Sequence, residues 1–174
     1  MTKRKIITEP DIILRKKSVT LEKVDDDLRN LMDDMLETMY AAPGIGLAAI
    51  QIGIDKRVIV MDISKNSEKK LPLYLVNPEI ISTSRNDSTY EEGCLSVPGQ
   101  FAEINRPERC HVKYLDYNGN QKEIKAEGLL ATCIQHEMDH LEGVLFIDYL
   151  SKLKKTMIVK KLKKHKESLE RIVV

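Results

Sequence analysis

The chain has 174 residues, the length of one ordinary domain, and is long enough to bury a hydrophobic core without disulfide bridges. Its 28 Lys and Arg residues nearly balance its 27 Asp and Glu residues, so a net charge of +1 excludes a generally polyanion-binding or strongly acidic protein. Charged residues make up 32% of the chain, and no run approaches the roughly 20 apolar residues of a bilayer span. We therefore expect a single domain over residues 1–174 without a membrane partner.

The amino-terminal residues and the cysteines bear on the cellular compartment. The first five residues, Met-Thr-Lys-Arg-Lys, are basic but are not followed by the apolar stretch of an export signal. The three cysteines are an odd number, which favours free thiols or metal ligands over a disulfide framework. These features predict a cytoplasmic protein.

The first half of the chain predicts one helix and two buried strands. Asp25–Asp27 supply N-cap candidates, and apolar residues recur at three- and four-residue steps over residues 28–39. This helix should end before Pro43, because proline cannot continue it. Residues 57–63 and 73–76 are short β-branched or apolar runs, which are typical of buried strands.

The second half predicts a loop, a hairpin and a further helix. Residues 82–88 are polar enough for a loop. Residues 110–117 and 121–125 flank an Asn-Gly pair, which favours a tight hairpin turn. Helical spacing returns over residues 129–141, and Gly143 is a natural stop for that helix.

The C-terminal segment differs from the rest in charge. Residues 151–174 hold eight lysines and one arginine against two glutamates, a net charge of +7, so the first 150 residues sum to −6. A basic helix is predicted at about 151–170, with an imperfect apolar stripe formed by Leu150, Leu153, Met157, Leu162 and Leu169. Together the elements predict an α+β fold: a single compact domain with antiparallel strands around a central helix, and a C-terminal helix.

A metal-binding pattern lies in the central helix. The segment Gln135-His-Glu-Met-Asp-His140 places two histidines four residues apart, so both point from one face, roughly 6 Å apart. Glu137 follows the first histidine and can take a proton from a water molecule on the ion. The alternative is two surface histidines with accidental spacing, but this pattern contains two of the chain's four histidines. We therefore expect a metal-binding helix.

Spacing alone does not identify the third protein ligand, although a catalytic ion usually has three. In one class of metalloproteases a third histidine lies six residues after the position of His140, and Phe146 stands there, which excludes that class. Cys133 would lie about a turn and a half of helix from the ion, so we expect it to line the site. Cys94 and Cys110 remain alternatives at this point.

A glycine-containing segment precedes these features. Gly44-Ile-Gly-Leu-Ala-Ala49 matches a dinucleotide-binding pattern, but a predicted helix precedes it where that pattern needs a strand, which excludes a nucleotide site. The segment instead predicts a loop whose missing side chains let a ligand lie against the backbone. The amide of Gln51 either donates to an anionic oxygen or is satisfied by its neighbours.

Three segments together resemble peptide deformylase, in the same order and at comparable separations. They are Gly44–Gln51, Glu92–Ser96 and Gln135–His140, and the resemblance extends from about residue 11 to residue 150. That family removes the N-formyl group from newly made polypeptides and releases formate. The resemblance therefore implies a metal-dependent hydrolase whose partners are nascent formylmethionyl polypeptides.

The resemblance also implies the parts of the site. The implied ligands of one divalent ion are Cys94, His136 and His140. Fe²⁺ is the implied ion, while Zn²⁺, Ni²⁺ and Co²⁺ suit the same donors. Glu137 is implied as the acid and base, and Gln51 with the backbone N–H of Leu95 as the oxyanion site.

The formylmethionine side chain needs an apolar pocket. The candidate substrate-binding residues are Gly44, Ile45, Gly46, Gly93, Leu129 and Cys133. Thr132, Gly99 and Phe101 depart from residues expected in relatives, which leaves the substrate preference open. Glu92 and Arg106 predict either an ion pair beside the site or a solvated pair.

The basic C-terminal helix has two interpretations. It is either a solvated helix that docks through its apolar stripe or a surface for RNA phosphate. In bacterial peptide deformylases this helix is associated with ribosome docking, so the resemblance implies the ribosome as a further partner. Two other functions stay open: a metallopeptidase of the HExxH type, and a non-enzymatic ribosome-associated protein with a structural metal. The non-enzymatic alternative conflicts with the presence of Glu137 beside the first histidine, because the ion of a structural site has a fourth protein ligand in place of water.

Overall fold

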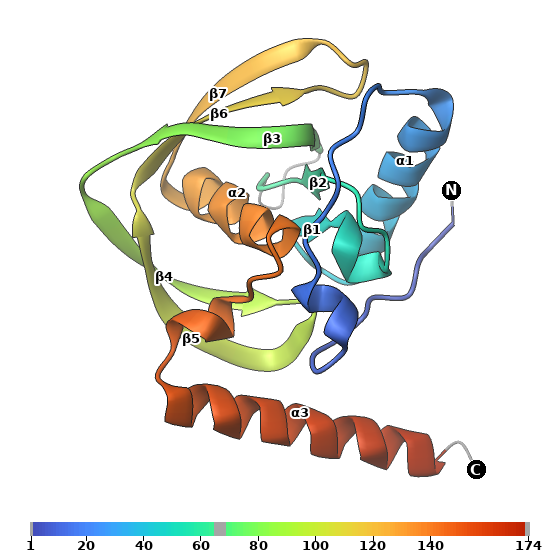
Figure 1. Ribbon diagram of the computed structural model, residues 1–174, viewed down its shortest axis with the longest axis vertical. Helices are drawn as coiled ribbons and strands as arrows, with labels where there is room; N and C mark the ends of the chain where they lie inside the picture. Colours follow the sequence, from blue (N-terminus) through green and yellow to red (C-terminus); the bar gives the residue numbers. More distant parts are fainter. Residues whose placement is uncertain (1, 65–68, 173–174) are drawn as a thin grey trace.

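Two antiparallel sheets and the helix between them organise the fold (Figure 1). One sheet has five strands in the order β1-β2-β3-β6-β7, and strands β4 and β5 form the other. This computed structural model describes residues 2–64 and 69–172. The main elements are α1 (Asp26–Ala41), β1 (Gly46–Ala48), β2 (Val58–Met61), β3 (Leu73–Thr83), β4 (Asp87–Cys94), β5 (Val97–Pro107), β6 (Arg109–Leu115), β7 (Gln121–Glu127), α2 (Gly128–Leu141) and α3 (Lys152–Ile172). The predicted α+β fold is confirmed.

Helix α1 begins and ends where the sequence predicts. The carboxylate of Asp25 accepts a hydrogen bond from the N–H of Leu28 and caps the first turn. The helix ends at Ala41, just before Pro43. Its buried face packs against β1 and β2 through Leu28, Leu31, Met32, Met35 and Met39.

The five-stranded sheet contains the predicted strands but differs in extent. Strand β2 is buried at every residue, and β3 continues well beyond the predicted end at residue 76. Two register shifts keep β3 paired with β6 while the second half of β3 becomes solvent-exposed, so the apolar signal stops before the strand does. The β6–β7 hairpin is present, but residues 116–120 join its strands in place of a tight two-residue turn. The Asp116 carboxylate accepts two backbone N–H bonds within that loop.

The β4–β5 hairpin is absent from the sequence prediction. Residues 82–88, predicted as a loop, include the end of β3 and the start of β4. Pro98 is the second residue of β5. Most side chains of both strands are exposed or half-buried, so these strands lack a clear apolar alternation. Both are edge strands, where proline is tolerated.

Helix α2 forms as predicted and fills the space between the sheets (Figure 1). Its apolar side chains join those of the five-stranded sheet in one core, which includes Ala48, Ile50, Ile59, Met61, Leu75, Cys110, Val112, Ala131, Ile134 and Leu141. Cys110 is a small buried hydrophobic residue, 3% exposed. Because protein surrounds α2, its polar residues face an internal site.

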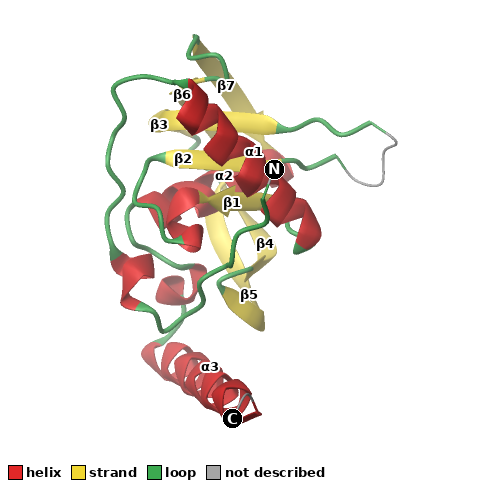
Figure 2. Cartoon of the chain, turned by 90° about the vertical axis from the view of Figure 1, so that its right-hand side faces the viewer, coloured by secondary structure: helices red, strands yellow, loops and turns green. Residues whose placement is uncertain are grey.

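Helix α3 lies at one end of the molecule, beside the β5 end of the two-stranded sheet (Figure 2). A helix is confirmed near 151–170, but its docking face differs from the predicted stripe. Leu162 is buried and Ile158 is half-buried, whereas Leu153 and Met157 are 71% and 53% exposed. The side chain of Leu169 lies outside the described residues. No helix in the described ranges is long and apolar enough to cross a membrane.

Gly143 provides a test of how α2 ends. Its φ is +74°, and a Cβ there would lie 2.3 Å from the carbonyl oxygen of Arg15. We predict that Gly143→Ala lowers the free energy of unfolding by about 3 kcal/mol or more, because a backbone clash adds to the strain of the left-handed conformation. Urea unfolding measures this loss.

Gly99→Ala is the matched control for this prediction. Gly99 has a similar φ of +71°, but nothing lies within 4 Å of a Cβ built there. Its replacement should cost only about 1–2 kcal/mol. Equal losses in the two variants would contradict the role of the Arg15 contact.

Candidate metal centre

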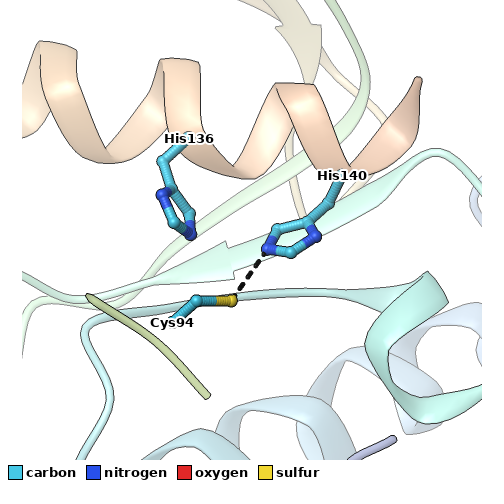
Figure 3. Close-up of side chains that lie close together, drawn as sticks. All are labelled: Cys94, His136 and His140. Atoms are coloured by element: carbon cyan, nitrogen blue, oxygen red, sulfur yellow. Dashed lines mark hydrogen bonds between the residues drawn. The ribbon is translucent and has the colours of Figure 1, made fainter. Parts of the chain in front are cut away.

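Three side chains converge between α2 and the end of β4 (Figure 3). His136 and His140 point from one face of α2 toward Cys94, the last residue of β4. Cys94 Sγ lies 3.3 Å from His140 Nε2, and the ligand atoms of all three residues lie within 4.8 Å of one another. In the described part of the chain, Cys94 completes this group, and neither Cys110 nor Cys133 belongs to it.

A buried ion pair orients His136. The Nδ1–H of His136 donates to Glu92 Oε2 at 2.8 Å, which leaves Nε2 available to an ion. Arg106 donates to both carboxylate oxygens of Glu92, at 2.6 and 3.0 Å, and both side chains are almost fully buried. Burial raises the pKa of Glu92, but the hydrogen bonds from His136 and Arg106 outweigh it and lower the pKa overall. Glu92 and Arg106 therefore form the predicted ion pair, not a solvated pair.

The same arginine continues the network toward the surface. Arg106 Nη1 donates to Asp139 Oδ2 at 2.8 Å, and the Tyr149 hydroxyl donates to the same oxygen at 2.9 Å. Sequence reasoning missed both residues, although Asp139 lies one helical turn after His136 on the same face. The network thus ties β4 and β5 to α2 and to the short 3₁₀ helix Phe146–Tyr149.

Glu137 is buried beside this cluster with an unsatisfied oxygen. It is 4% exposed, and its Oε2 has no hydrogen-bond partner among the described residues. Burial is the largest cause that raises the pKa of Glu137, to about 7. A Cβ at Gly46 would lie 2.4 Å from Glu137 Oε1, so this glycine makes room for the protein's own carboxylate. We had expected the glycine segment to make room for a ligand.

Gln51 is held in one orientation by its neighbours. Its Oε1 accepts from the N–H of Ala48 at 2.9 Å, and its Nε2 donates to Ser96 Oγ at 3.0 Å. Nε2 also lies 3.6 Å from Cys94 Sγ. The side chain is therefore satisfied by its neighbours and also directed at the site, so the two predicted alternatives coexist. Ser96, which sequence reasoning left without a role, stands in the Glu92–Ser96 motif.

The donor set fits one divalent ion. One thiolate at about 2.3 Å and imidazole nitrogens at about 2.1 Å from a tetrahedral ion would lie about 3.6 Å apart, close to the observed 3.3 Å. Burial lowers the pKa of His140 well below its usual value, which favours the neutral ring that a metal ligand needs. Three protein donors would leave one coordination position of such an ion free for water or substrate, and Glu137 lines the same cavity.

A cavity of about 440 Å³ opens onto this cluster. Its lining includes Cys94, His136 and Glu137, together with Gln51 and Leu95. All predicted substrate-binding residues also line it: Gly44, Ile45, Gly46, Gly93, Leu129 and Cys133. His140 is not among the lining residues and is only 1% exposed.

Sequence reasoning did not assign Tyr90 or Pro43 to this cavity, although both line it. Tyr90 lies on β4, which the sequence did not predict as a strand, so no periodicity pointed to its orientation. Phe101 is 66% exposed at the same cavity, and its ring lies against Gly93. The departures noted at Thr132, Gly99 and Phe101 therefore all fall on the cavity lining.

A Cys/His/His cluster beside a buried carboxylate, open to an apolar cavity, defines the class of metal-dependent hydrolases. Comparison with known proteins identifies the family. A family model described as polypeptide deformylase matches residues 3–156. The chain is 66% identical to the peptide deformylase of Pelagibacter ubique over the full length of both proteins. It is 62% identical to that of Phenylobacterium zucineum, over 95% of this chain and 98% of the relative.

Solved structures agree with these relatives. The crystal structure of peptide deformylase from Ehrlichia chaffeensis matches with a TM-score of 0.92 and 45% identity, over 96% of this chain and 98% of that one. A peptide deformylase from Legionella pneumophila matches with a TM-score of 0.89 and 46% identity, over 98% and 99%. The chain belongs to the polypeptide deformylase family, which removes the N-formyl group from nascent polypeptides. This membership decides against the metallopeptidase and against the non-enzymatic alternative.

The buried ion pair between Glu92 and Arg106 allows a test of how the metal-binding side chains are held in position. Glu92→Gln keeps the side-chain shape but removes the charge that faces Arg106 and His136. We predict a loss of about 3–5 kcal/mol in the free energy of unfolding and a 10–100-fold weaker affinity for a divalent ion. Urea unfolding and competition with a chelator measure the two effects.

Glu123→Gln is the matched control, because it breaks the solvent-exposed contact of Glu123 with His111. It should change the free energy of unfolding by less than about 0.5 kcal/mol and leave ion affinity unchanged. If Glu92→Gln behaved like this control, the conclusion that Glu92 orients the ring of His136 would be wrong.

Proposed function

We propose that Cys94, His136 and His140 hold one divalent ion and that Glu137, Gln51 and Leu95 act on the formyl group of the substrate. The observation that carries this proposal is the convergence of one sulfur and two imidazoles beside a buried carboxylate with an unpaired oxygen. When bound, the ion would acidify a water molecule and polarise the formyl oxygen. Fe²⁺ is the proposed ion, and its support is the family resemblance together with a thiolate and imidazole donor set.

The oxyanion site is proposed from Gln51 and Leu95. The Gln51 amide is oriented by Ala48 and Ser96 before any substrate binds, and its second N–H is directed at Cys94 Sγ in the site. The backbone N–H of Leu95 is the second proposed donor, because Leu95 follows Cys94 and lines the same cavity. Such preorganised donors stabilise the negative charge that grows on the formyl oxygen, each by about 3 kcal/mol.

Glu137 is proposed to move the proton. Its pKa near 7 suits a group that first accepts a proton from water and then delivers it to the departing amine nitrogen. The unpaired Oε2 supports this role, because a carboxylate oxygen without a partner is available to a water molecule. The other oxygen of the Glu137 carboxylate, Oε1, lies close to the backbone of β1, because Gly46 has no side chain there.

The cavity is proposed to bind the first side chain of the substrate. Ile45 and Leu129 supply apolar surface, and Cys133 lies in the same lining. Gly44, Gly46 and Gly93 complete the lining and leave room there for the protein's own side chains of Leu95, Glu137 and Phe101. Burial raises the pKa of Cys133, so this thiol stays neutral in the pocket. A cavity that combines apolar lining with the Cys94 cluster suits a methionine side chain whose formyl group faces the cluster.

Glu137→Gln tests the proposed reaction. The variant keeps the side-chain shape but cannot accept the proton, so we predict that formate release from formyl-Met-Ala falls about 10²–10⁴-fold. The ratio of bound ion to protein should stay at the wild-type value, because Glu137 is not a proposed ligand. A formate assay and elemental analysis measure the two quantities.

Glu108→Gln, an exposed charge change in the connection between β5 and β6, is the control for that experiment and should keep wild-type turnover. Full turnover in Glu137→Gln would show that another group moves the proton. Loss of the ion in that variant would show that Glu137 is a ligand.

We further propose that α3 contacts the ribosome and that the protein acts in the cytoplasm, where nascent chains emerge. Lys160, Lys161, Lys163 and Lys164 of α3 are exposed, and no ion pair is found for them within the described residues. Their positive charge favours attraction to RNA phosphate.

The double change Lys160→Glu and Lys164→Glu tests this contact. We predict ribosome binding weaker by about tenfold or more and a salt dependence reduced by about two units of slope, because two phosphate contacts are lost. Co-sedimentation with ribosomes at several salt concentrations measures both. Lys122→Glu with Lys125→Glu on β7 makes the same change in net charge and should leave binding unchanged. Equal weakening in both variants would contradict a specific role for α3.

A further inference from the structure

Thr132 of the cavity lining carries a buried hydroxyl without a partner in the described part of the chain. The residue lines the cavity and is 5% exposed, and its Oγ1 has no hydrogen-bond partner among the described residues. A buried hydroxyl without a partner is destabilising, so its presence calls for a partner when the cavity is occupied.

Thr132 lies in a helix, where a threonine hydroxyl usually has a backbone acceptor. A threonine in a helix commonly donates its hydroxyl to the carbonyl oxygen four residues earlier. Thr38 of α1 does so, with Oγ1 2.6 Å from the carbonyl oxygen of Asp34. Thr132 of α2 does not, and its hydroxyl proton is therefore left without an acceptor within the described residues.

The distance from the metal cluster matches one atom of a methionine side chain. Thr132 lies four residues before His136 on the same face of α2, which corresponds to about 6 Å along the helix. In formylmethionine five bonds separate the formyl carbon from the thioether sulfur, about 6 Å in an extended conformation. A substrate with its formyl group at the cluster can therefore bring its sulfur to the level of Thr132.

We propose that the Thr132 hydroxyl donates a hydrogen bond to the thioether sulfur of the substrate's first residue and so selects methionine over hydrocarbon side chains of the same shape. This inference rests on the proposed function, because it assumes that the formyl group lies at the Cys94 cluster. Thr132 is then a specificity-determining residue of this chain.

The chemistry of the two side chains explains the selection. A thioether sulfur is a weak hydrogen-bond acceptor, whereas the methylene that replaces it in norleucine accepts nothing. Norleucine fills the same volume but leaves the buried hydroxyl unpaired, and that penalty opposes its binding. The apolar neighbours Ile45 and Leu129 favour both side chains about equally, so they contribute little to the difference.

The test compares formate release from formyl-Met-Ala and formyl-norleucyl-Ala as a ratio of kcat/KM within each variant. A ratio cancels losses of fold or of bound ion, because these affect both substrates alike. We expect Thr132→Val, which keeps the shape but removes the hydroxyl, to lower the preference for methionine about threefold or more. Thr132→Ser keeps the hydroxyl and should keep the wild-type ratio. Thr132→Ala, a second variant without the hydroxyl, should behave as Thr132→Val does.

Two outcomes would overturn the proposal. An unchanged ratio in Thr132→Val and Thr132→Ala would show that the hydroxyl does not contact the sulfur. An equal fall in Thr132→Ser would assign the preference to the threonine methyl group. Failure of the proposed function is distinguishable from both, since the wild-type protein would then release formate from neither substrate.

Discussion

The site depends on one buried ion pair, between Glu92 of β4 and Arg106 of β5. Both side chains are almost fully buried, and the two charges satisfy each other through two hydrogen bonds. Glu92 also fixes the ring of His136, and Arg106 also binds Asp139 of the same helix. A buried pair of this kind contributes little net stability, because desolvation offsets its attraction. Its consequence here is positional: the hairpin that carries Cys94 is attached to the helix that carries both histidines.

Gly46 and the burial of α2 determine the surroundings of Glu137. Gly46 lets the backbone of β1 approach Glu137, and the resulting enclosure raises the pKa of that carboxyl into the neutral range. Helix α2 has protein on both sides, so its polar face can only point into the internal site. The lining of the cavity beside it combines apolar residues, such as Ile45 and Leu129, with polar residues of the site. This combination suits a substrate that is apolar in its side chain and polar at its amino terminus.

The sequence predicted the metal-binding helix and the general fold because both have strong local signals. The histidine spacing and the apolar period of α2 are readable within fourteen residues. The β4–β5 hairpin was missed because its exposed strands lack apolar alternation, and the burial of Glu92 and Arg106 arises only when those strands pair. Cys94 could not be preferred over Cys110 by spacing, since its position depends on that same hairpin. The docking face of α3 was partly wrong because two of its apolar residues, Leu153 and Met157, are exposed.

X-ray absorption spectroscopy of the protein loaded with one equivalent of Fe²⁺ under anaerobic conditions tests the central claim most directly. If the sulfur of Cys94 and the rings of His136 and His140 surround the ion, the spectrum will show one sulfur neighbour at about 2.3 Å and two nitrogen neighbours at about 2.1 Å. A first shell of oxygen and nitrogen alone, without sulfur, would contradict the account.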